Sequence, residues 1–414
     1  MPLVHMKDML EHARREGYAV GAFDVVGLEF LEAVMAGVEQ AGAPVIISLA
    51  ESHFEHYDFE LLMAAVEAAA KRSPVPAAIH LDHGASLASA IRAINLGANG
   101  VMVDASNLPL DGNIERTRAI VDMAHGCDVP VEGELGYVAG VEGEDAEKHP
   151  GEVIYTSVED ASAYVAATGV DFLAVSIGTV HGRLRTKPRL DFDRLAAINE
   201  ALGIPLVIHG GTGLADDQFR RLIANGVTKI NYYTALADRA ADAIREQAGA
   251  DPGAGYTRLL SGTRAAIRDE VVRCCELWGS AGRAAALLDH CRPWTPVEHT
   301  ILYNVEGLDE NGVEAMMREG RAVLSGIPGV RRVFTGDAVT EDAPYRHCWL
   351  VQFASAAVID SYREHPAHQR FANERFRPHA GDRVSIDFAE RARDERCEDA
   401  PNEGGQSASG AAPG

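Results

Sequence analysis

The chain has 414 residues, 47% of them hydrophobic, and its 61 acidic and 38 basic residues give a formal charge of −23. Such a charge repels phosphate backbones and anionic lipids, so nucleic acids and membrane surfaces are poor partners. No apolar run approaches the roughly 18 residues of a membrane span, and no basic segment followed by an apolar stretch opens the chain. We therefore expect a cytoplasmic protein. The six cysteines are sparse and form no C-x-x-C pair, which argues against a disulfide scaffold or a thiolate zinc site.

Short strand-like runs alternate with amphipathic helical runs between residue 19 and about residue 248. The helical runs include 28–41 after the first strand and 191–202 after the sixth. Eight such units predict a parallel sheet closed into a (β/α)₈ TIM barrel. An open dinucleotide-binding sheet lacks support, because no G-x-G-x-x-G follows the first strand. The predicted strands are 19–23, 45–49, 77–81, 100–103, 129–135, 170–176, 204–209 and 227–231.

A second, smaller unit follows a helical run over 257–277. Its predicted order is β-α-β-β-α-β, which is the α+β ferredoxin-like arrangement. The end of the chain is highly charged and then rich in Gly, Ser, Ala and Pro, so we expect it to be disordered. The predicted division is a barrel over 1–288, a linker over 289–298, a ferredoxin-like domain over 299–389 and a disordered tail over 390–414.

Reactive residues occur where six successive barrel strands end. The carboxyl ends of barrel strands meet at one rim, which is where TIM barrels carry their active sites. We therefore expect these residues to surround one cavity. The segments are 80–84, 103–106, 131–136, 176–182, 208–213 and 229–231.

Three of these segments contribute a histidine, namely His83, His181 and His209. Three imidazoles with one open position are the ligand set of a catalytic zinc ion. A single histidine at a strand end is more often a structural residue, but three at matching strand ends favour a metal site. His80 lies further inside its strand and is not counted among the ligands.

Glycines beside two of these histidines allow backbone N–H groups to approach a ligand closely. The 209–213 segment also leads into a predicted helix near residue 215, and a helix N-terminus favours phosphate. Barrels of this type often bind phosphate after strands seven and eight. The glycines are Gly182, Gly210 and Gly211, and the candidate side-chain donors are Thr212, Asn231 and Thr234.

Five motifs in residues 1 to about 288 resemble those of the class II fructose- and tagatose-bisphosphate aldolases. The resemblance implies an aldehyde-lyase that cleaves or forms the C3–C4 bond of a ketose 1-phosphate or ketose 1,6-bisphosphate. The products would be dihydroxyacetone phosphate and an aldehyde. The motifs are His-Leu-Asp-His-Gly at 80–84, Glu-Gly-Glu-Leu-Gly at 132–136, Thr-Val-His-Gly at 179–182, His-Gly-Gly-Thr-Gly at 209–213 and Lys-Ile-Asn at 229–231.

The same resemblance implies a role for each matching residue. His83, His181 and His209 would bind a divalent metal, usually zinc, and Asp82 would act as acid and base on the C4 hydroxyl. Asp104 and Glu134 would line an alternative metal position. Either a second metal ion or a monovalent cation could occupy it. Glu142 would exchange the C3 proton. The glycines, Thr212, Asn231 and Thr234 would hold dihydroxyacetone phosphate, and Asn231 would also contact the enediolate oxygen.

Departures from the family pattern leave the aldehyde open. Tyr232 and Tyr233 replace small aliphatic residues and are expected to reshape the pocket. The segment 50–56 has no counterpart that we identify, and no basic residue is assigned to a second phosphate.

The smaller unit resembles the stress-responsive α/β-barrel (Dabb) domains through residues 299–303, 327–330 and 362–371. These domains pair their sheets, which implies a homo-oligomer, a dimer or a tetramer. A catalytic role for His299, His347 and His368 stays an alternative to dimerisation.

Two other functions compete with a metal-dependent aldolase. A Schiff-base aldolase would need a rim lysine, and Lys229 is the one lysine on a predicted strand. That mechanism leaves the three histidines unexplained. A non-catalytic barrel that serves as a scaffold for the smaller unit conflicts with the intact set of metal, acid/base and glycine positions.

Overall fold

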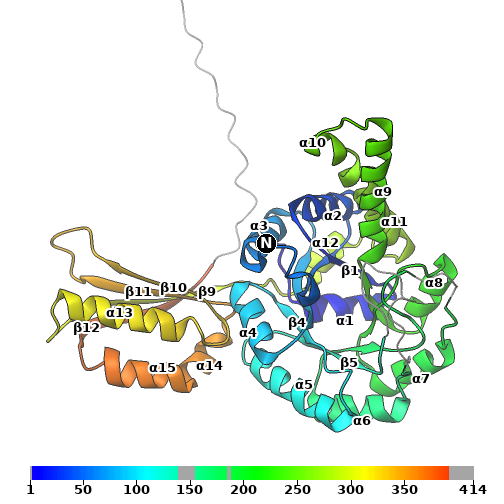
Figure 1. Cartoon of the computed structure of the whole chain (residues 1–414). Helices are drawn as coiled ribbons and strands as arrows, with labels where there is room; N and C mark the ends of the chain where they lie inside the picture. The colour runs from blue at the N-terminus through cyan, green and yellow to red at the C-terminus, as the bar shows by residue number, and fades with distance from the viewer. Residues whose placement is uncertain (1, 139–153, 184–187, 391–414) are drawn as a thin grey trace, which may run out of the picture.

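The computed structural model describes residues 2–138, 154–183 and 188–390. Two units lie side by side, a barrel and a smaller sheet domain (Figure 1). The helices among the described residues are all too short or too polar to cross a membrane.

The larger unit is a closed barrel of eight parallel strands in sequence order, with β8 paired to β1. The predicted TIM barrel is therefore confirmed, and all eight strands occur within the predicted runs or a few residues of them. The strands are β1 Val20–Asp24, β2 Val45–Ala50, β3 Ala77–Gly84, β4 Gly100–Val103, β5 Val131–Leu135, β6 Phe172–Val175, β7 Leu206–Ile208 and β8 Val227–Tyr232.

Helices surround this barrel, and local sequence sets several of their ends. The Asp191 side chain accepts a hydrogen bond from Arg194 N at 3.0 Å and so caps the helix that begins at residue 192. The predicted helical run over 257–277 is broken at Gly262, whose φ of 93° is left-handed. The helices are α1 Met6–Glu16, α2 Leu28–Ala41, α3 Phe59–Arg72, α4 Leu87–Leu96, α5 Leu110–His125, α6 Val158–Thr168, α7 Phe192–Leu202, α8 Asp216–Ala224, α9 Thr234–Ala250, α10 Tyr256–Leu259, α11 Thr263–Leu277 and α12 Ala284–His290, with the 3₁₀ turn η1 Glu51–His53.

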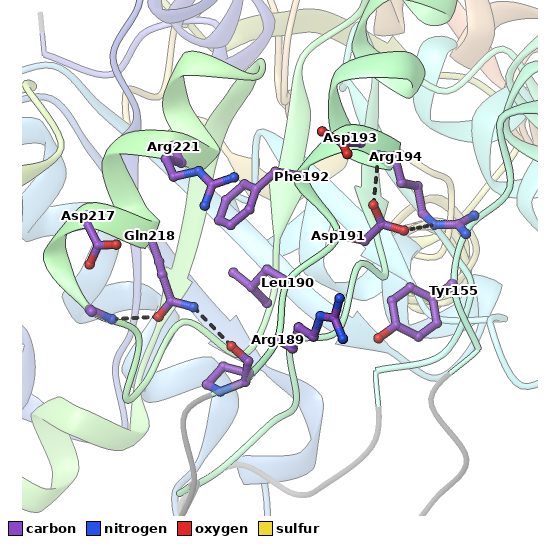
Figure 2. Close-up of a pocket in the computed structure, with 12 residues that line it drawn as sticks. Tyr155, Arg189, Leu190, Asp191, Phe192, Asp193, Arg194, Asp217, Gln218 and Arg221 are labelled. Atoms are coloured by element: carbon purple, nitrogen blue, oxygen red, sulfur yellow. Dashed lines mark hydrogen bonds and ion pairs between the residues drawn. The ribbon is translucent and has the colours of Figure 1, made fainter.

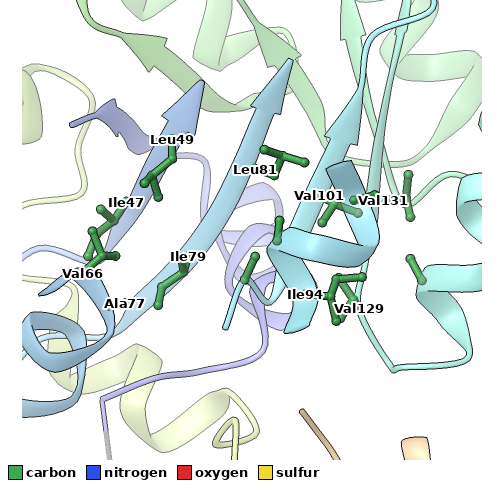
Figure 3. Packing of buried hydrophobic residues seen from close by; sticks show 14 of the residues in the cluster. Ile47, Leu49, Val66, Ala77, Ile79, Leu81, Ile94, Val101, Val129 and Val131 are labelled. Carbon is green, nitrogen blue, oxygen red and sulfur yellow. The ribbon is translucent and has the colours of Figure 1, made fainter. Parts of the chain in front are cut away.

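Apolar side chains pack in two layers, one on each face of the barrel sheet. Outward-facing residues such as Ile47, Ile79 and Val101 pack against the helices (Figure 3). A separate apolar cluster fills the amino-terminal end of the barrel lumen and includes Ile46, Ala78 and residues of α1. Helix α1 was not predicted from the sequence. Burial of the strands on both faces explains why they read as nearly continuous apolar runs.

The character of the lumen changes along each strand. Because side chains alternate between faces, residues two apart share one face. Ala78 belongs to the apolar lumen cluster, and His80 and Asp82 follow it with the same parity. Val207 is likewise followed by His209. The inward-facing side chains are therefore apolar in the interior of the barrel and polar at the carboxyl ends of the strands, where they are still buried.

The smaller unit is a four-stranded antiparallel sheet in the order β10-β11-β9-β12. Its β-α-β-β-α-β chain order and this strand order confirm the ferredoxin-like fold. Trp349 on the sheet packs against Phe371 and Phe376 from the helical face, with ring centroids 5.7 and 6.2 Å apart. The elements are β9 Val297–Val305, α13 Glu310–Leu324, β10 Val330–Asp337, β11 His347–Phe353, α14 Val358–Glu364, α15 Pro366–Phe371, the π-helical turn η3 Ala372–Phe376 and β12 Ala380–Ala389.

Specific polar contacts join the two units. The Asn95 side chain on α4 donates to the carbonyls of Ser325 and Ile327, both at 3.1 Å, and accepts from Gly329 N at 2.8 Å. Arg331 makes a two-point ion pair with Glu67 on α3 at 2.7 and 2.8 Å. The smaller unit is therefore docked on the α3–α4 side of the barrel (Figure 1).

Candidate active site

The three predicted metal-binding histidines meet at the carboxyl-terminal rim of the barrel. Their ring centroids lie 4.6 Å apart for His83 and His209, 5.1 Å for His83 and His181, and 5.7 Å for His181 and His209. One nitrogen from each ring lies within 4.8 Å of the other two. Three loops separated by up to 126 residues thus form one cluster.

A local irregularity in β3 brings two consecutive residues, Asp82 and His83, into this cluster. Successive strand residues normally point to opposite faces, so an inward Asp82 would send His83 outward. The register between β3 and β4 shifts between Leu81 and Gly84, and His83 has a left-handed φ of 44°. This conformation costs a non-glycine residue about 1–3 kcal/mol. The strained residue is therefore one of the three histidines of the cluster.

Each histidine is oriented by an acceptor on the side that faces away from the cluster. His83 Nδ1 lies 3.2 Å from Asp104 Oδ2, and His209 Nε2 lies 2.9 Å from Glu132 Oε1. His181 Nδ1 lies 3.2 Å from the Val138 carbonyl oxygen. Carboxylates and carbonyls in this position fix the tautomer of metal-binding histidines.

The nitrogens that face inward fit a divalent cation. His83 Nε2 and His209 Nδ1 lie 2.8 Å apart, and His181 Nε2 is buried with no hydrogen-bond partner among the described residues. If Nδ1 of His181 donates to the Val138 carbonyl, Nε2 presents a lone pair. Burial, together with the charges of His83 and His209, lowers the pKa of His181 to about 3, which keeps this nitrogen unprotonated. For His83, burial would lower the pKa, but Asp82 and Asp104 outweigh it and raise the pKa well above its usual value. Because neutral imidazole is the form that binds metal, a cation at the cluster would have to displace the proton of His83.

Glu132 joins the cluster to a buried ion pair, a role that the sequence did not reveal. Its Oε1 accepts from His209, and its Oε2 lies 2.7 Å from Lys229 Nζ. Lys229 also donates to Asn231 Oδ1 at 2.7 Å. Burial would raise the pKa of Glu132, but Lys229, His209 and His80 outweigh it and hold the pKa at about 2. The sequence signal that could have placed Glu132 in the site is the alternation of side chains along a strand. Glu132 lies on the same face of its strand as Glu134, and Lys229 on the same face as Asn231.

We predict that Glu132→Gln weakens metal affinity about 10–100-fold, because His209 loses its orienting carboxylate. The variant also leaves Lys229 as a buried charge without its counter-ion, which typically costs about 3–5 kcal/mol of folding free energy. Metal titration and thermal unfolding would measure both effects. Glu159→Gln, at an exposed position on α6, is the matched control. Unchanged metal affinity in a folded Glu132→Gln protein would contradict the orienting role.

Asp82 is fully buried beside the histidines. Its two carboxylate oxygens lie 3.0 and 2.9 Å from Asn231 Nδ2. Burial opposes the charged form, but the nearby His83, His209 and Lys229 outweigh it and lower the pKa of Asp82 below its usual range. The carboxylate is therefore ionised and held in one orientation.

Asp104 and Glu134 form a second group with His83 whose ligand atoms also lie within 4.8 Å of one another. Glu134 Oε2 is buried without a hydrogen-bond partner in the described part of the chain. Burial and the negative charge of Asp104 raise the pKa of Glu134 to about 8. A cation at this position would give Glu134 Oε2 a partner and would favour the ionised form of this carboxyl group.

The predicted phosphate-binding loop lies against the N-terminus of α9. Thr212 Oγ1 accepts from Ala235 N in the first turn of this helix at 3.2 Å, and Thr234 begins the helix. Gly210 has a φ of 68°, and a Cβ there would lie 2.2 Å from the Val180 carbonyl oxygen. Only glycine fits this close approach of the His181 and His209 loops. Gly211 follows in the same loop, and Gly182, with a φ of 85°, follows His181.

The residues expected at the rim also include Glu142, Tyr232 and Tyr233. Glu142 lies outside the described residues. Tyr232 does not face the pocket, because its side chain lies on the outward face of β8 together with Ile230. There its hydroxyl donates to Glu270 Oε1 at 2.9 Å. Tyr233 does lie at the rim, with its ring centroid 4.5 Å from that of the buried His53. The prediction that both tyrosines shape the pocket is wrong for Tyr232.

A separate hollow of about 940 Å³ is lined by residues 188–194 at the start of α7, by residues of α8 and the position before it, and by Tyr155 (Figure 2). The Arg221 guanidinium lies 3.7 Å from the centre of the Phe192 ring, and Arg194 pairs with Asp191 at 3.0 Å. Within the described residues, the histidine cluster does not contribute to its walls. The size of a hollow therefore does not locate the site here.

The three histidines singled out in the smaller unit separate into two places. His299 and His368 line one cavity between the sheet and the helices. His347 is not part of that lining and instead lies 2.7 Å from Asp337 Oδ1.

The fold and the rim residues together define a TIM barrel with a histidine cluster suited to a metal ion. Residues 4–283 match the family described as Fructose-bisphosphate aldolase class-II, and residues 297–390 match the Stress responsive A/B Barrel Domain. The chain belongs to the class II fructose-bisphosphate aldolase family and carries a Dabb domain after the barrel. Both resemblances found in the motifs are thereby confirmed.

Solved structures agree with this assignment. The YdjI aldolase from Escherichia coli K12 is 32% identical, with a TM-score of 0.61, over 68% of this chain and 99% of that one. A Coccidioides immitis protein assigned as a fructose-1,6-bisphosphate aldolase is 29% identical, with a TM-score of 0.62, over 67% and 97%. The fructose-bisphosphate aldolase of Campylobacter jejuni, 20% identical over 67% and 96% with a TM-score of 0.58, shares the fold.

Proposed function

We propose that this protein is a metal-dependent aldolase that cleaves or forms the C3–C4 bond of a ketose 1-phosphate or ketose 1,6-bisphosphate. The products of cleavage are dihydroxyacetone phosphate and an aldehyde. The observation that carries the proposal is the arrangement of three inward-facing imidazole nitrogens beside the buried carboxylate of Asp82. Membership of the class II aldolase family supports it.

His83, His181 and His209 would hold the metal, with zinc the ion that a three-histidine set favours. When bound, the ion supplies a Lewis acid that polarises the substrate carbonyl. Asp104, Glu132 and the Val138 carbonyl keep the three rings in place. Asp104 and Glu134 would serve a second cation position.

Asp82 would move the proton of the C4 hydroxyl. Since its pKa lies below the usual range, it is ionised at neutral pH and accepts a proton in the cleavage direction. Asn231 holds this carboxylate through its amide and would donate to the substrate oxygen once substrate is bound. Glu142 would exchange the C3 proton, as the family resemblance implies.

The phosphate of dihydroxyacetone phosphate would bind at the loop of Gly210, Gly211 and Thr212. Contact of this loop with the N-terminus of α9 supports the assignment, because helix N-termini attract anions. Gly182 on the neighbouring loop and Thr234 at the start of α9 complete the proposed set.

The Schiff-base alternative receives less support. Lys229 is completely buried, with Nζ 2.7 Å from both Glu132 Oε2 and Asn231 Oδ1. A lysine nucleophile must be free to attack the substrate carbonyl, whereas Nζ of Lys229 is engaged by both of these partners. Borohydride treatment with substrate should therefore leave no adduct at Lys229.

A substrate panel tests the proposal and distinguishes its two substrate classes. Metal-loaded protein would be incubated with ketose 1-phosphates and ketose 1,6-bisphosphates, and release of dihydroxyacetone phosphate would be measured with a coupled assay. We expect release from at least one member of the panel, and none with His181→Ala. No release from any member by a metal-loaded protein would contradict the aldolase proposal.

The smaller unit would mediate assembly into a homo-oligomer. The face of its sheet opposite the helices exposes large apolar residues, and such a face is typical of a protein interface. A second copy would cover it most simply, through a two-fold axis. These residues are Leu302, Phe334, Val384, Ile386 and Phe388, between 37% and 53% exposed.

We predict that Ile386→Asp lowers the assembly state, because it would bury a carboxylate in an apolar interface. Light scattering should show a smaller species, with cleavage activity largely kept. Val339→Asp, at a fully exposed position outside this face, is the control and should not change the mass. The same mass for both variants would argue against an interface on this face.

A further inference from the structure

The smaller unit contains a cavity that the aldolase reaction does not use. It has a volume of about 310 Å³ and lies between strands β9 and β12 and the helical segment α14, α15 and η3. This volume is at the lower end of the range for small-molecule pockets. The cavity is on the helical side of the sheet, because His299 and Ile301 alternate with the residues of the exposed apolar face. Pairing of that opposite face would leave the cavity accessible.

The wall of this cavity combines apolar and aromatic surfaces. Phe353 on β11 and Tyr362 on α14 are buried, with ring centroids 4.9 Å apart. Ile301 and Phe376 extend the apolar wall. Tyr362 also packs on His368, with ring centroids 4.2 Å apart. Such walls suit a flat, apolar body about the size of one ring.

Positive charge gathers on the same lining. Arg363, Arg377 and Arg383 all line the cavity. Arg363 pairs with Asp360 at 2.9 Å. Arg377 bonds the Asn373 side chain, and Arg383 donates to the Ala380 carbonyl at 3.1 Å. Within the described parts of the chain, neither Arg377 nor Arg383 has a carboxylate partner.

One carboxylate, Asp387, does line the cavity, but His299 already engages it. His299 Nδ1 lies 2.6 Å from Asp387 Oδ1. When Nδ1 donates to Asp387, Nε2 is the nitrogen left for a ligand, and no described residue hydrogen-bonds it. The lining therefore keeps a surplus of positive charge, in a chain whose formal charge is −23.

We propose that this cavity is a second binding site, for a small organic carboxylate with an apolar, ring-sized body. Arg377 and Arg383 would bind the carboxylate, and guanidinium groups match its planar geometry. Phe353 and Tyr362 would contact the apolar body. The inference is independent of the aldolase proposal, because no residue of the barrel rim contributes to it.

Benzoate is the probe for this site, because it joins one carboxylate to one ring. Isothermal titration of full-length, metal-loaded protein should show saturable binding at one site per chain, with a dissociation constant on the order of 0.1–1 mM. The double variant Arg377→Met with Arg383→Met should weaken binding at least about tenfold, the scale of one charge-assisted contact. The control, Arg318→Met with Arg370→Met, removes two exposed arginines outside the lining and should bind as the parent does.

Two further measurements complete the test. Benzamide, which is uncharged, should bind more weakly than benzoate. Ser385→Trp places a large side chain in the lining on β12 and should abolish binding, with folding checked by circular dichroism. Absence of saturable benzoate binding, or equal binding by both double variants, would overturn the proposal. Equal binding would place benzoate elsewhere, such as at the barrel metal.

Discussion

Asp82→Ala is expected to lower the rate of carbon–carbon cleavage about 10²–10⁴-fold, the range for removing a general acid or base. The variant should keep its metal, because the acceptors that orient the three histidines are Asp104, Glu132 and the Val138 carbonyl. Initial rates and metal content, measured on the same preparation, would check both statements. Asp122→Ala, at an exposed position on α5, is the matched control.

Hydrogen isotope exchange separates the role of Asp82 from that of Glu142. With dihydroxyacetone phosphate alone, exchange at C3 requires no proton transfer to the C4 hydroxyl. Asp82→Ala should therefore keep most of the exchange, and Glu142→Ala should lose it. The reverse pattern would show that the two roles have been assigned to the wrong residues.

Removal of the metal is expected to have the largest effect, reducing cleavage to the background of the assay. The described site contains no other group placed to accept electron density from the C3–C4 bond, since Lys229 is held in its ion pair with Glu132. Zinc or a similar divalent ion should restore activity after chelation. Full activity in a fully demetallated sample would rule out the proposed mechanism.

Single replacements extend this test to the ligands. Alanine in place of His83, His181 or His209 should lower metal occupancy and turnover together. His56→Ala is the control, because His56 is exposed and does not belong to the cluster. A histidine variant that keeps its metal but loses turnover would be assigned to substrate binding instead.

The eight strands, the barrel and the three histidines could be predicted from the sequence because the signals are local. A strand buried on both faces reads as an apolar run whatever its neighbours are. In a parallel barrel, every strand end reaches the same rim, so the carboxyl ends of strands three, six and seven bring their histidines to one end of the barrel. The β-α-β-β-α-β order of the smaller unit is equally local.

Contacts between distant residues were decided only by the tertiary structure. Parity places Glu132 inside the barrel, but its joint contact with His209 and Lys229 depends on the packing of three strands that are not all adjacent. Parity alone would also send His83 away from Asp82, and the shift against β4 brings it back.

The cavity beside β12 likewise depends on tertiary packing. His299 and Asp387 are 88 residues apart, and antiparallel pairing of β9 with β12 places them opposite each other. Arg377 reaches the same cavity from the end of η3, through the packing of α14 and α15 on the sheet. The local pattern determined which elements form and which face of each is buried. Which side chains then meet across those faces depends on strand register and helix packing, and no local run of sequence contains that information.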